Sequence, residues 1–324
     1  MRLHETLTQF LKATLCFAIT VSASASFAQP RPIRVIVAAA PGGLLDGSVR
    51  RLAPKMGELL GQPVVVENRA GAGGIIGMGE VAKSAPDGQT LLYYNEAVAL
   101  IPYVFKNPGF DPLRDFTPIT QTLSASFGLF AHPSLPVNSL KELVTYSKAN
   151  PGKVNGSSGG AGTASHLFFE AFKLASGADM QHIPYKSAGP VVTDFLGGQI
   201  QLFAISTTLM APHVASGKAK ALAVATPRRV AQMPNAQTFA ESGFPNLDYS
   251  TWLGFFGPAN LPPATTQRLY DAATKALNDP AMHKGFTDQG LDVLGSTPAE
   301  FRSFFAAEHA KFGKVAAAAG IQPE

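Results

Sequence analysis

Residues 33–46, IRVIVAAAPGGLLD, combine a strand pattern, a glycine turn and the start of a helix. Residues 34–37 are a mostly β-branched run between Pro32 and a glycine pair, which indicates a buried strand. Apolar residues at 49, 52, 56 and 59 predict a helix after the turn. The first N–H groups of such a helix can hold an anionic oxygen without a lysine or arginine. The segment is therefore a candidate anion site, although a strand-to-helix turn in any α/β domain has the same pattern.

The alternation of strand and helix recurs along the chain. Strands are expected at 63–68 (also buried), 90–94, 127–131, 154–157, 181–185, 200–205, 220–225 and 252–257. Helical patterns follow glycine turns at 69–74 and 159–162, and recur at 139–150, 189–196, 209–215, 263–277 and 281–289. A capping box at residues 297–300 opens a last helix, in which we expect Phe301, Phe304 and Phe305 to be core residues. This order predicts βαβ units, a mostly parallel sheet and an α/β fold.

The composition excludes several classes of protein. The chain has 324 residues, enough for two domains or one large one, with 46% hydrophobic and 15% charged residues. The formal net charge is +4, and the basic residues are scattered, which argues against nucleic acid or an electrostatic membrane anchor as partner. No His-Glu-x-x-His motif or His/Asp cluster indicates a metal site.

Residues 1–28 have the pattern of a signal peptide. Arg2 and Lys12 give a positive start, residues 13–21 are apolar, and Ser26 and Ala28 are the small residues of a cleavage site. The apolar run is too short to span a bilayer. Cleavage after Ala28 would remove Cys16, the only cysteine, and we expect the mature protein to reside in the periplasm.

Two motifs suggest other functions. The glycines at 71, 73, 74 and 77 do not fit the G-x-G-x-x-G spacing of dinucleotide-binding proteins, so we expect no cofactor. Residues 156–160, GSSGG, do fit G-x-S-x-G, the nucleophile turn of many hydrolases. A secreted esterase would use Ser158, with either Asp194 and His213 or Asp248 and His283. This alternative stays open at the level of the sequence.

An ordered set of motifs resembles a known family. They are PGG followed by Asp46, LGQPVVVENRAGAGG at 60–74, APDGQTLL at 85–92, FDPLRDFTPI at 110–119, HPSLPVNSLKELV at 132–144, SSGGAGTASHL at 157–167, HIPYKSAGP at 182–190, DFLGGQI at 194–200, GKAKALAVAT at 217–226 and GSTPAEF at 295–301. Together they resemble the Bug-type periplasmic receptors, the solute-binding components of tripartite tricarboxylate transporters. The resemblance spans essentially all of the expected mature chain.

This resemblance implies a two-lobed, periplasmic-binding-protein-like fold of type II, in which two linker strands join lobes that close on a ligand. One lobe would hold residues 29–129 plus 250–324 and the other 130–249, with linkers near 127–131 and 252–257. The expected protein is a monomer that is not an enzyme. Its expected partners are a small organic carboxylate and the membrane components of the transporter.

The resemblance also implies a set of ligand-binding residues. Backbone amides, especially those at 42–43 and 158–160, and hydroxyl groups of two glycine turns would hold the carboxylate. The implied residues are Ala39, Pro41, Gly42 and Gly43 in the first turn, Ser157, Ser158, Gly159, Gly160, Thr163 and His166 in the second, and Asn95 at the end of a strand.

Three further candidate residues depart from the family pattern. Leu44 replaces a small hydroxyl residue, Ile205 replaces an aspartate, and Glu96 stands where serine, threonine or glycine is common. Together with Leu45, and with Ala39 in place of an aromatic residue common in the family, Leu44 and Ile205 would make the site larger and drier. We therefore expect a carboxylate with a sizeable apolar or aromatic body rather than citrate or aspartate. Glu96 would either face the ligand or, as we expect, point to solvent.

Overall fold

The structure is a computed structural model that describes residues 31–160, 162–185 and 187–323. The chain divides into two units, Met1–Arg31 and Pro32–Glu324, and every helix and strand named below belongs to the second unit. The expected signal peptide, residues 1–28, lies outside the described residues. Among the helices of the described part, none is long and apolar enough to cross a membrane.

The first group of strands contains β1 (Ile33–Val37), β2 (Val64–Asn68) and β3 (Thr90–Asn95). β1 pairs in parallel with both β2 and β3, which confirms the βαβ prediction for this segment. β9 (Ser250–Pro258) lies antiparallel to β3. The prediction that β2 is buried was wrong, because β2 is the edge strand and Val65 is 42% exposed.

The second group contains β5 (Asn155–Ser157), β6 (Gln181–His182), β7 (Leu202–Ser206) and β8 (Lys220–Val224). β5 pairs in parallel with β6 and β7. β7 and β8 both lie antiparallel to the end of a longer strand, β4. In each group the strands farthest from the other group pair in parallel. The antiparallel pairs of β9 and β4, and of β4 and β7, lie between these parallel parts.

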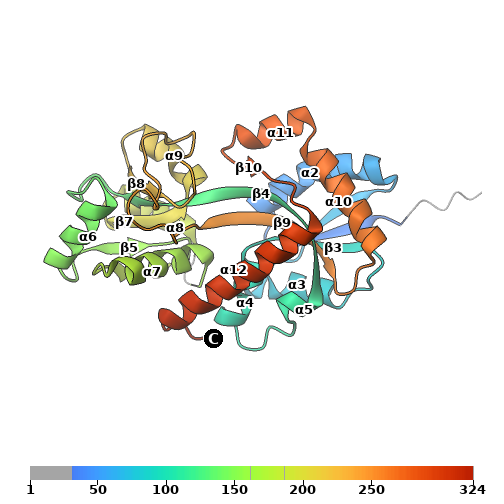
Figure 1. The fold of residues 1–324 in the computed structure, drawn as a ribbon. Coiled ribbons are helices and arrows are strands. Elements are labelled where there is room, and N and C mark those ends of the chain that lie inside the picture. The colour runs from blue at the N-terminus through green and yellow to red at the C-terminus, as the bar shows by residue number, and fades with distance from the viewer. Residues whose placement is uncertain (1–30, 161, 186, 324) are drawn as a thin grey trace, which may run out of the picture. The chain divides into compact units, whose positions relative to one another are not determined.

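β4 (Phe116–Ala131) belongs to both groups of strands (Figure 1). Residues 116–126 pair with β9, and 127–131 pair with β7. The short β10 (Asp292–Val293) pairs with β4 on the first side. The chain therefore changes from one group to the other at residues 126–127 and 249–250. The expected linkers, 127–131 and 252–257, lie inside the sheets instead.

Helices cover both faces of these strands (Figure 1). Their bounds are α2 (Leu44–Leu60), α3 (Ile75–Ala82) after the 3₁₀ turn η2 (Ala72–Gly74), α4 (Ala97–Val104), α5 (Pro112–Asp115), α6 (Leu140–Ala149), α7 (Ala164–Ser176), α8 (Ala188–Leu196), α9 (Thr207–Ala215), α10 (Pro263–Leu277), α11 (Pro280–Thr287) and α12 (Pro298–Ala318). The sequence did not predict α4, α5 or the first part of β4.

The core follows the alternation of side chains along the strands. Val35 and Val37 pack toward α2 and α10, whereas Ile36 packs on the opposite face with α3, α4 and α12. On that opposite face the core continues into the second group, because α12 contacts both α4 and α7 (Figure 1). On the first face the two groups keep separate hydrophobic clusters.

α2 buries one side of an amphipathic helix, as its sequence predicts. Val49, Leu52 and Met56 are buried under β1 and α10. Leu59 is 42% exposed, and Leu60 completes the buried side instead. Gly61 ends the helix in a left-handed conformation with φ 68°, and its N–H donates to carbonyl groups of the last turn.

Candidate functional site

A cavity of about 520 Å³ lies where four parallel-paired strands end. Its lining includes Ala39 and Ala40 after β1, Asn95 at the end of β3, Gly159 after β5 and Ser206 at the end of β7. Ligands of open α/β sheets bind at the carboxyl ends of strands, and the volume suits a small organic molecule. The cavity is therefore the candidate ligand site.

The first residues of several helices also meet at this cavity. Gly43, Glu96 and Thr163 are the N-cap residues of α2, α4 and α7, and each lines the cavity. Ala188 of α8 and Ser206, the N-cap of α9, line it as well. Helix N-termini carry partial positive charge and free N–H groups. Their convergence favours an anion without a basic side chain.

Side-chain capping differs among the helices, and α7 at the cavity is capped by Thr163. α5, α6, α11 and α12, whose N-termini lie elsewhere, are capped by the side chains of Asp111, Ser139, Asp279 and Thr297. Within the described residues, the N-cap of α2 is Gly43, which has no capping side chain, and the N-cap side chains of α4, α8 and α9 accept no capping hydrogen bond. At the cavity, Thr163 accepts from the His166 N–H of α7 and Asn95 Oδ1 accepts from the Ala97 N–H of α4, so the starts of α2, α8 and α9 are the ones without a side-chain cap.

The first glycine turn uses one of its expected donors internally. The Gly42 N–H donates to Asp46 Oδ2 at 2.9 Å, and Arg50 Nε donates to Asp46 Oδ1 at 2.8 Å. Burial raises the pKa of Asp46, but these hydrogen bonds outweigh it and keep the pKa below its usual value. The expectation of a free Gly42 N–H was therefore wrong, and the first residues of α2, Leu44 and Leu45, present the donors instead.

The second glycine turn is also internally bonded. The Gly159 N–H donates to Ser165 Oγ at 2.8 Å, and the Gly160 N–H approaches Ser158 Oγ at 3.4 Å. Gly159 still lines the cavity, together with Thr163. The expectation that the amides of 158–160 are free was wrong for these two donors.

Ser158 does not form the catalytic arrangement of a hydrolase. Its side chain is fully buried, and Oγ lies 2.9 Å from His182 Nε2 and 3.2 Å from the Gly160 carbonyl oxygen. His182 stacks on His166 at 4.0 Å, and burial, with the nearby His166 and Lys173, lowers the pKa of His182 to about 3. In the described chain, neither of the two Asp–His pairs expected for an esterase contacts Ser158. These groups hold the turn in place.

The walls of the cavity are mostly apolar. They include Leu44, Leu45, Leu100, Ile101, Val104, Phe105, Phe127, Ile205 and Leu253. Among the described lining residues there is no lysine, arginine or histidine. A ligand here would meet apolar surface along its body and helix N-termini at its charged end.

Glu96 is buried, 6% exposed, and lines the cavity, so the expectation that it points to solvent was wrong. Its Oε2 accepts hydrogen bonds from Thr251 Oγ1 at 2.8 Å and from the Trp252 N–H at 3.2 Å. Burial raises the pKa of Glu96 to about 7, although both hydrogen bonds lower it. Glu308 adds to the increase through its negative charge.

The raised pKa of Glu96 predicts a pH dependence of stability. The folded state holds this proton up to about pH 7, whereas the unfolded chain loses it near 4.5, so stability falls as the pH rises through this interval. Glu96→Gln removes the titrating group. We therefore expect the unfolding free energy of this variant, relative to the wild type, to rise with pH by on the order of 3 kcal/mol and then level off.

Urea unfolding at several pH values checks this prediction. Glu308→Gln is the comparison variant: because the Glu308 charge raises the pKa of Glu96, this change should move the interval to lower pH without abolishing the trend. A constant difference between Glu96→Gln and wild type across the interval would contradict the assignment.

The structure brings together part of the predicted residue set. Ala39, Gly43, Leu44, Asn95, Glu96, Gly159, Thr163 and Ile205 line the cavity. Pro41, Gly42, Ser157, Ser158, Gly160 and His166 are not among the described lining residues; they belong to the turns or support them. The prediction missed the wall supplied by α4, although the apolar run 97–104 is a signal that could have indicated it.

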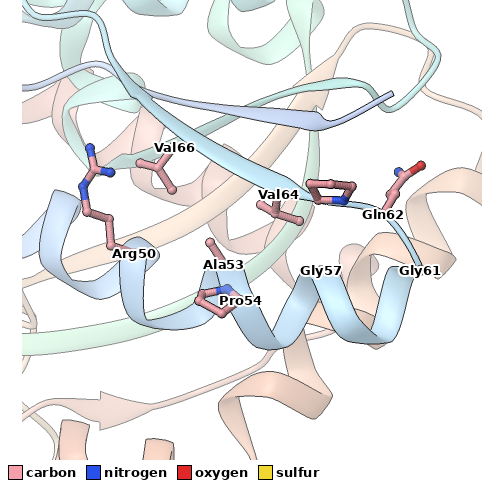
Figure 2. Close-up of a pocket in the computed structure, with 9 residues that line it drawn as sticks. Arg50, Ala53, Pro54, Gly57, Gly61, Gln62, Val64 and Val66 are labelled. Carbon is pink, nitrogen blue, oxygen red and sulfur yellow. The ribbon is translucent and has the colours of Figure 1, made fainter. Parts of the chain in front are cut away.

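A second cavity, of about 600 Å³, lies between α2 and β2 (Figure 2). Figure 2 shows Ala53, Pro54 and Gly57 on the helix side and Val64 on the strand side. This groove reaches the C-terminal end of α2, where carbonyl groups disfavour an anion. Its described basic residue, Arg50, is already paired with Asp46. It is the less suitable site for a carboxylate.

Metal-ligating side chains do not gather in the described ranges: they contain no group of three or more His, Cys, Asp and Glu residues placed to hold an ion. The chemistry available at the cavity is hydrogen bonding, helix-dipole attraction and apolar contact.

Comparison with known proteins agrees with this fold. Protein BugT of Bordetella pertussis (strain Tohama I) is 35% identical over 306 residues, which cover 94% of each chain. The structure of the periplasmic binding protein BugD has a TM-score of 0.75 at 33% identity, covering 91% of this chain and 99% of that one. R. palustris Rpa4515 with adipate has a TM-score of 0.78 at 28% identity, with coverage of 91% and 99%.

The fold and the cavity at its strand ends define a solute-binding protein of the periplasmic-binding-protein class. Residues 48–321 match the family model of the tripartite tricarboxylate transporter family receptor, and the chain belongs to this family. The resemblance seen in the sequence is thereby confirmed. Members of this family are receptors rather than enzymes, so the esterase alternative is set aside.

Proposed function

We propose that this receptor captures a small organic carboxylate with a sizeable apolar or aromatic body in the periplasm. It then delivers this ligand to the membrane components of a tripartite tricarboxylate-type transporter. The observation that carries the proposal is the convergence of the N-termini of α2, α4, α7, α8 and α9 on one mostly apolar cavity. The family's description supports the transport role.

The cavity offers binding groups for both the carboxylate and the apolar body of the ligand. Free N–H groups in the first turns of the helices suit carboxylate oxygens. Residues such as Phe105, Phe127 and Leu253 offer apolar surface, and burying a ring or chain there gains about 25 cal/mol per Å². The structure of Rpa4515, a relative, was solved with adipate, a carboxylate with an apolar chain.

Capture by closure of two lobes fits the strand arrangement. In this proposal one lobe holds residues 29–129 plus 250–324 and the other holds 130–249. β4 crosses between the strand groups, and the chain returns at residues 249–250. Ala39 and Gly159, from different groups, line the same cavity. A ligand that touches both would favour the closed state by its differential affinity.

A thermal-shift screen of carboxylates tests the ligand class. At about 100 times its Kd, a ligand stabilises the protein by about 2.7 kcal/mol, which raises the Tm by several degrees. We expect phenyl-substituted and medium-chain carboxylates to produce this shift more strongly than citrate or aspartate. Titration followed by Trp252 fluorescence checks each hit, since the backbone N–H of Trp252 donates to Glu96 at the cavity while its indole N–H donates to Glu308.

Two outcomes would contradict the proposal. Tight binding of citrate or aspartate, with apolar carboxylates inert, would show that the wall residues were misinterpreted. The absence of a shift with every carboxylate would remove the proposed function itself.

A further inference from the structure

The carboxylate of Glu96 is buried and still has the capacity to accept hydrogen bonds at the cavity. Its Oε2 is held by Thr251 and Trp252 of β9. Among the described residues, no other residue donates a hydrogen bond to Oε1, and the side chain lines the cavity. The Glu96 backbone N–H also donates to its own carboxylate. A carboxylate can accept about four hydrogen bonds, so this buried group keeps acceptor capacity, and a hydrogen-bond donor from the ligand would stabilise it.

A second buried acid, Glu308, has both a hydrogen-bond donor and a cation from within the protein as partners. Glu308 is also 6% exposed, and its Oε2 accepts a hydrogen bond from Trp252 Nε1 at 3.3 Å. Glu308 lies outside the cavity lining and forms an ion pair with Lys311. Within the described chain Glu96 has no such cation. The two acids flank Trp252, but only Glu96 faces the space for a ligand.

The groups around Glu96 favour a positive donor over a second acid. Its neighbours are Tyr94 on β3, Thr251 and Trp252 on β9, and Glu308 on α12. Burial raises the pKa of Tyr94 to about 12, so this phenol stays neutral. A ligand carboxylate placed beside Glu96 would be repelled or would require Glu96 to be protonated. The helix N-termini already provide a separate place for that carboxylate.

We propose that Glu96 selects ligands in which a protonated amine accompanies the carboxylate and the apolar body, and hence that the ligand class is apolar amino acids. The inference rests on the proposed function and narrows it. The ligand carboxylate would meet the helix N-termini, its ammonium group would donate to Glu96, and its side chain would contact the apolar wall. Glu96 then acts as the specificity-determining residue.

Matched ligand pairs test this inference. L-phenylalanine and 3-phenylpropanoic acid differ only in the amine, as do L-leucine and 4-methylpentanoic acid. Calorimetric titration of the wild type is expected to give tighter binding of the amino acid in each pair, by about tenfold or more, as one charge-assisted hydrogen bond provides. In Glu96→Gln, which keeps an acceptor for Thr251 and Trp252, this ratio is expected to fall by about tenfold.

The pH dependence should have opposite signs for the two ligands of a pair. Binding of the amino acid requires ionised Glu96, so its affinity should decrease as the pH falls below about 7. Binding of the amine-free acid favours protonated Glu96, so its affinity should decrease as the pH rises above that value. Glu96→Gln should remove both trends, and a purely structural role of Glu96 would produce neither.

Glu308→Gln is the matched control, because it alters the acid on the other side of Trp252 without touching the cavity. Well above pH 7, where Glu96 is ionised in both proteins, its ligand ratios should equal those of the wild type, and loss of the Glu308 charge should move the pH trends to lower pH without removing them. Equal or tighter binding of the amine-free acids by the wild type would overturn the inference while leaving the proposed function in place. Failure of both members of each pair to bind would overturn the inference and the proposed function together.

Discussion

Gly43→Asp is expected to weaken the binding of a carboxylate ligand by about 100-fold, because the new side chain would occupy the start of α2 with a negative charge. Gly43 is the N-cap of α2, with φ −83° and ψ −179°, a conformation that other residues adopt freely. A Cβ atom at this position would meet nothing within 4 Å. The aspartate can therefore accept hydrogen bonds from the first-turn N–H groups that would otherwise hold the ligand.

The expected loss of affinity follows from the hydrogen bonds between the α2 N–H groups and the ligand carboxylate that the variant would remove. Each hydrogen bond to a charged group contributes about 1.5–3 kcal/mol, and about 1.4 kcal/mol corresponds to tenfold in affinity. The free protein should keep its stability to within about 0.5 kcal/mol, because glycine and aspartate differ by only a few tenths at an N-cap. Calorimetric titration and urea unfolding measure the two quantities separately.

Gly43→Ser is the matched control, since serine caps the helix without adding charge. We expect it to weaken binding by about tenfold or less. If Gly43→Asp binds the ligand as tightly as the wild type, the start of α2 does not hold the carboxylate.

Much of the fold was predictable because the strands of the parallel pairs are strongly apolar. Residues 34–37 and 90–94 are of this kind, and both became strands, which pair in parallel with each other. The first part of β4 was not predicted because buried threonines interrupt its hydrophobic pattern. Thr120 and Thr122 are fully buried, and their hydroxyl groups donate to the carbonyl oxygens of Ser296 and Leu253. These partners come from distant segments, so no local pattern indicates them.

The candidate site was predictable to a different extent. Glycine turns and helix starts are local features, and they located Gly43 and Gly159 at the cavity. The orientation of Glu96 depends on Thr251 and Trp252, more than 150 positions away in the sequence. Similarly, the use of the Gly42 N–H by Asp46 follows from side-chain geometry that the residue types alone do not determine.

Phe301→Ala is expected to lower the free energy of unfolding by about 3–5 kcal/mol, the usual cost of removing a fully buried aromatic ring. Phe301 lies in the first turn of α12, and its ring centroid is 4.9 Å from Phe256 and 5.5 Å from Trp252. It also fills the space above Gly254, where a Cβ atom would approach the ring to 2.5 Å. The cavity left by alanine has rigid aromatic and sheet neighbours, so little of it can collapse.

Phe304→Ala is the control on the same helix, because Phe304 also contacts Trp252, at 5.6 Å between centroids, but is only partly buried. Its truncation should cost less than half as much, since less apolar area leaves the core. Circular dichroism in urea measures both variants without depending on Trp252, which contacts each ring. Equal losses would mean that α12 stabilises the core through its whole length, including its contacts with α4 and α7, rather than through the Phe301 ring.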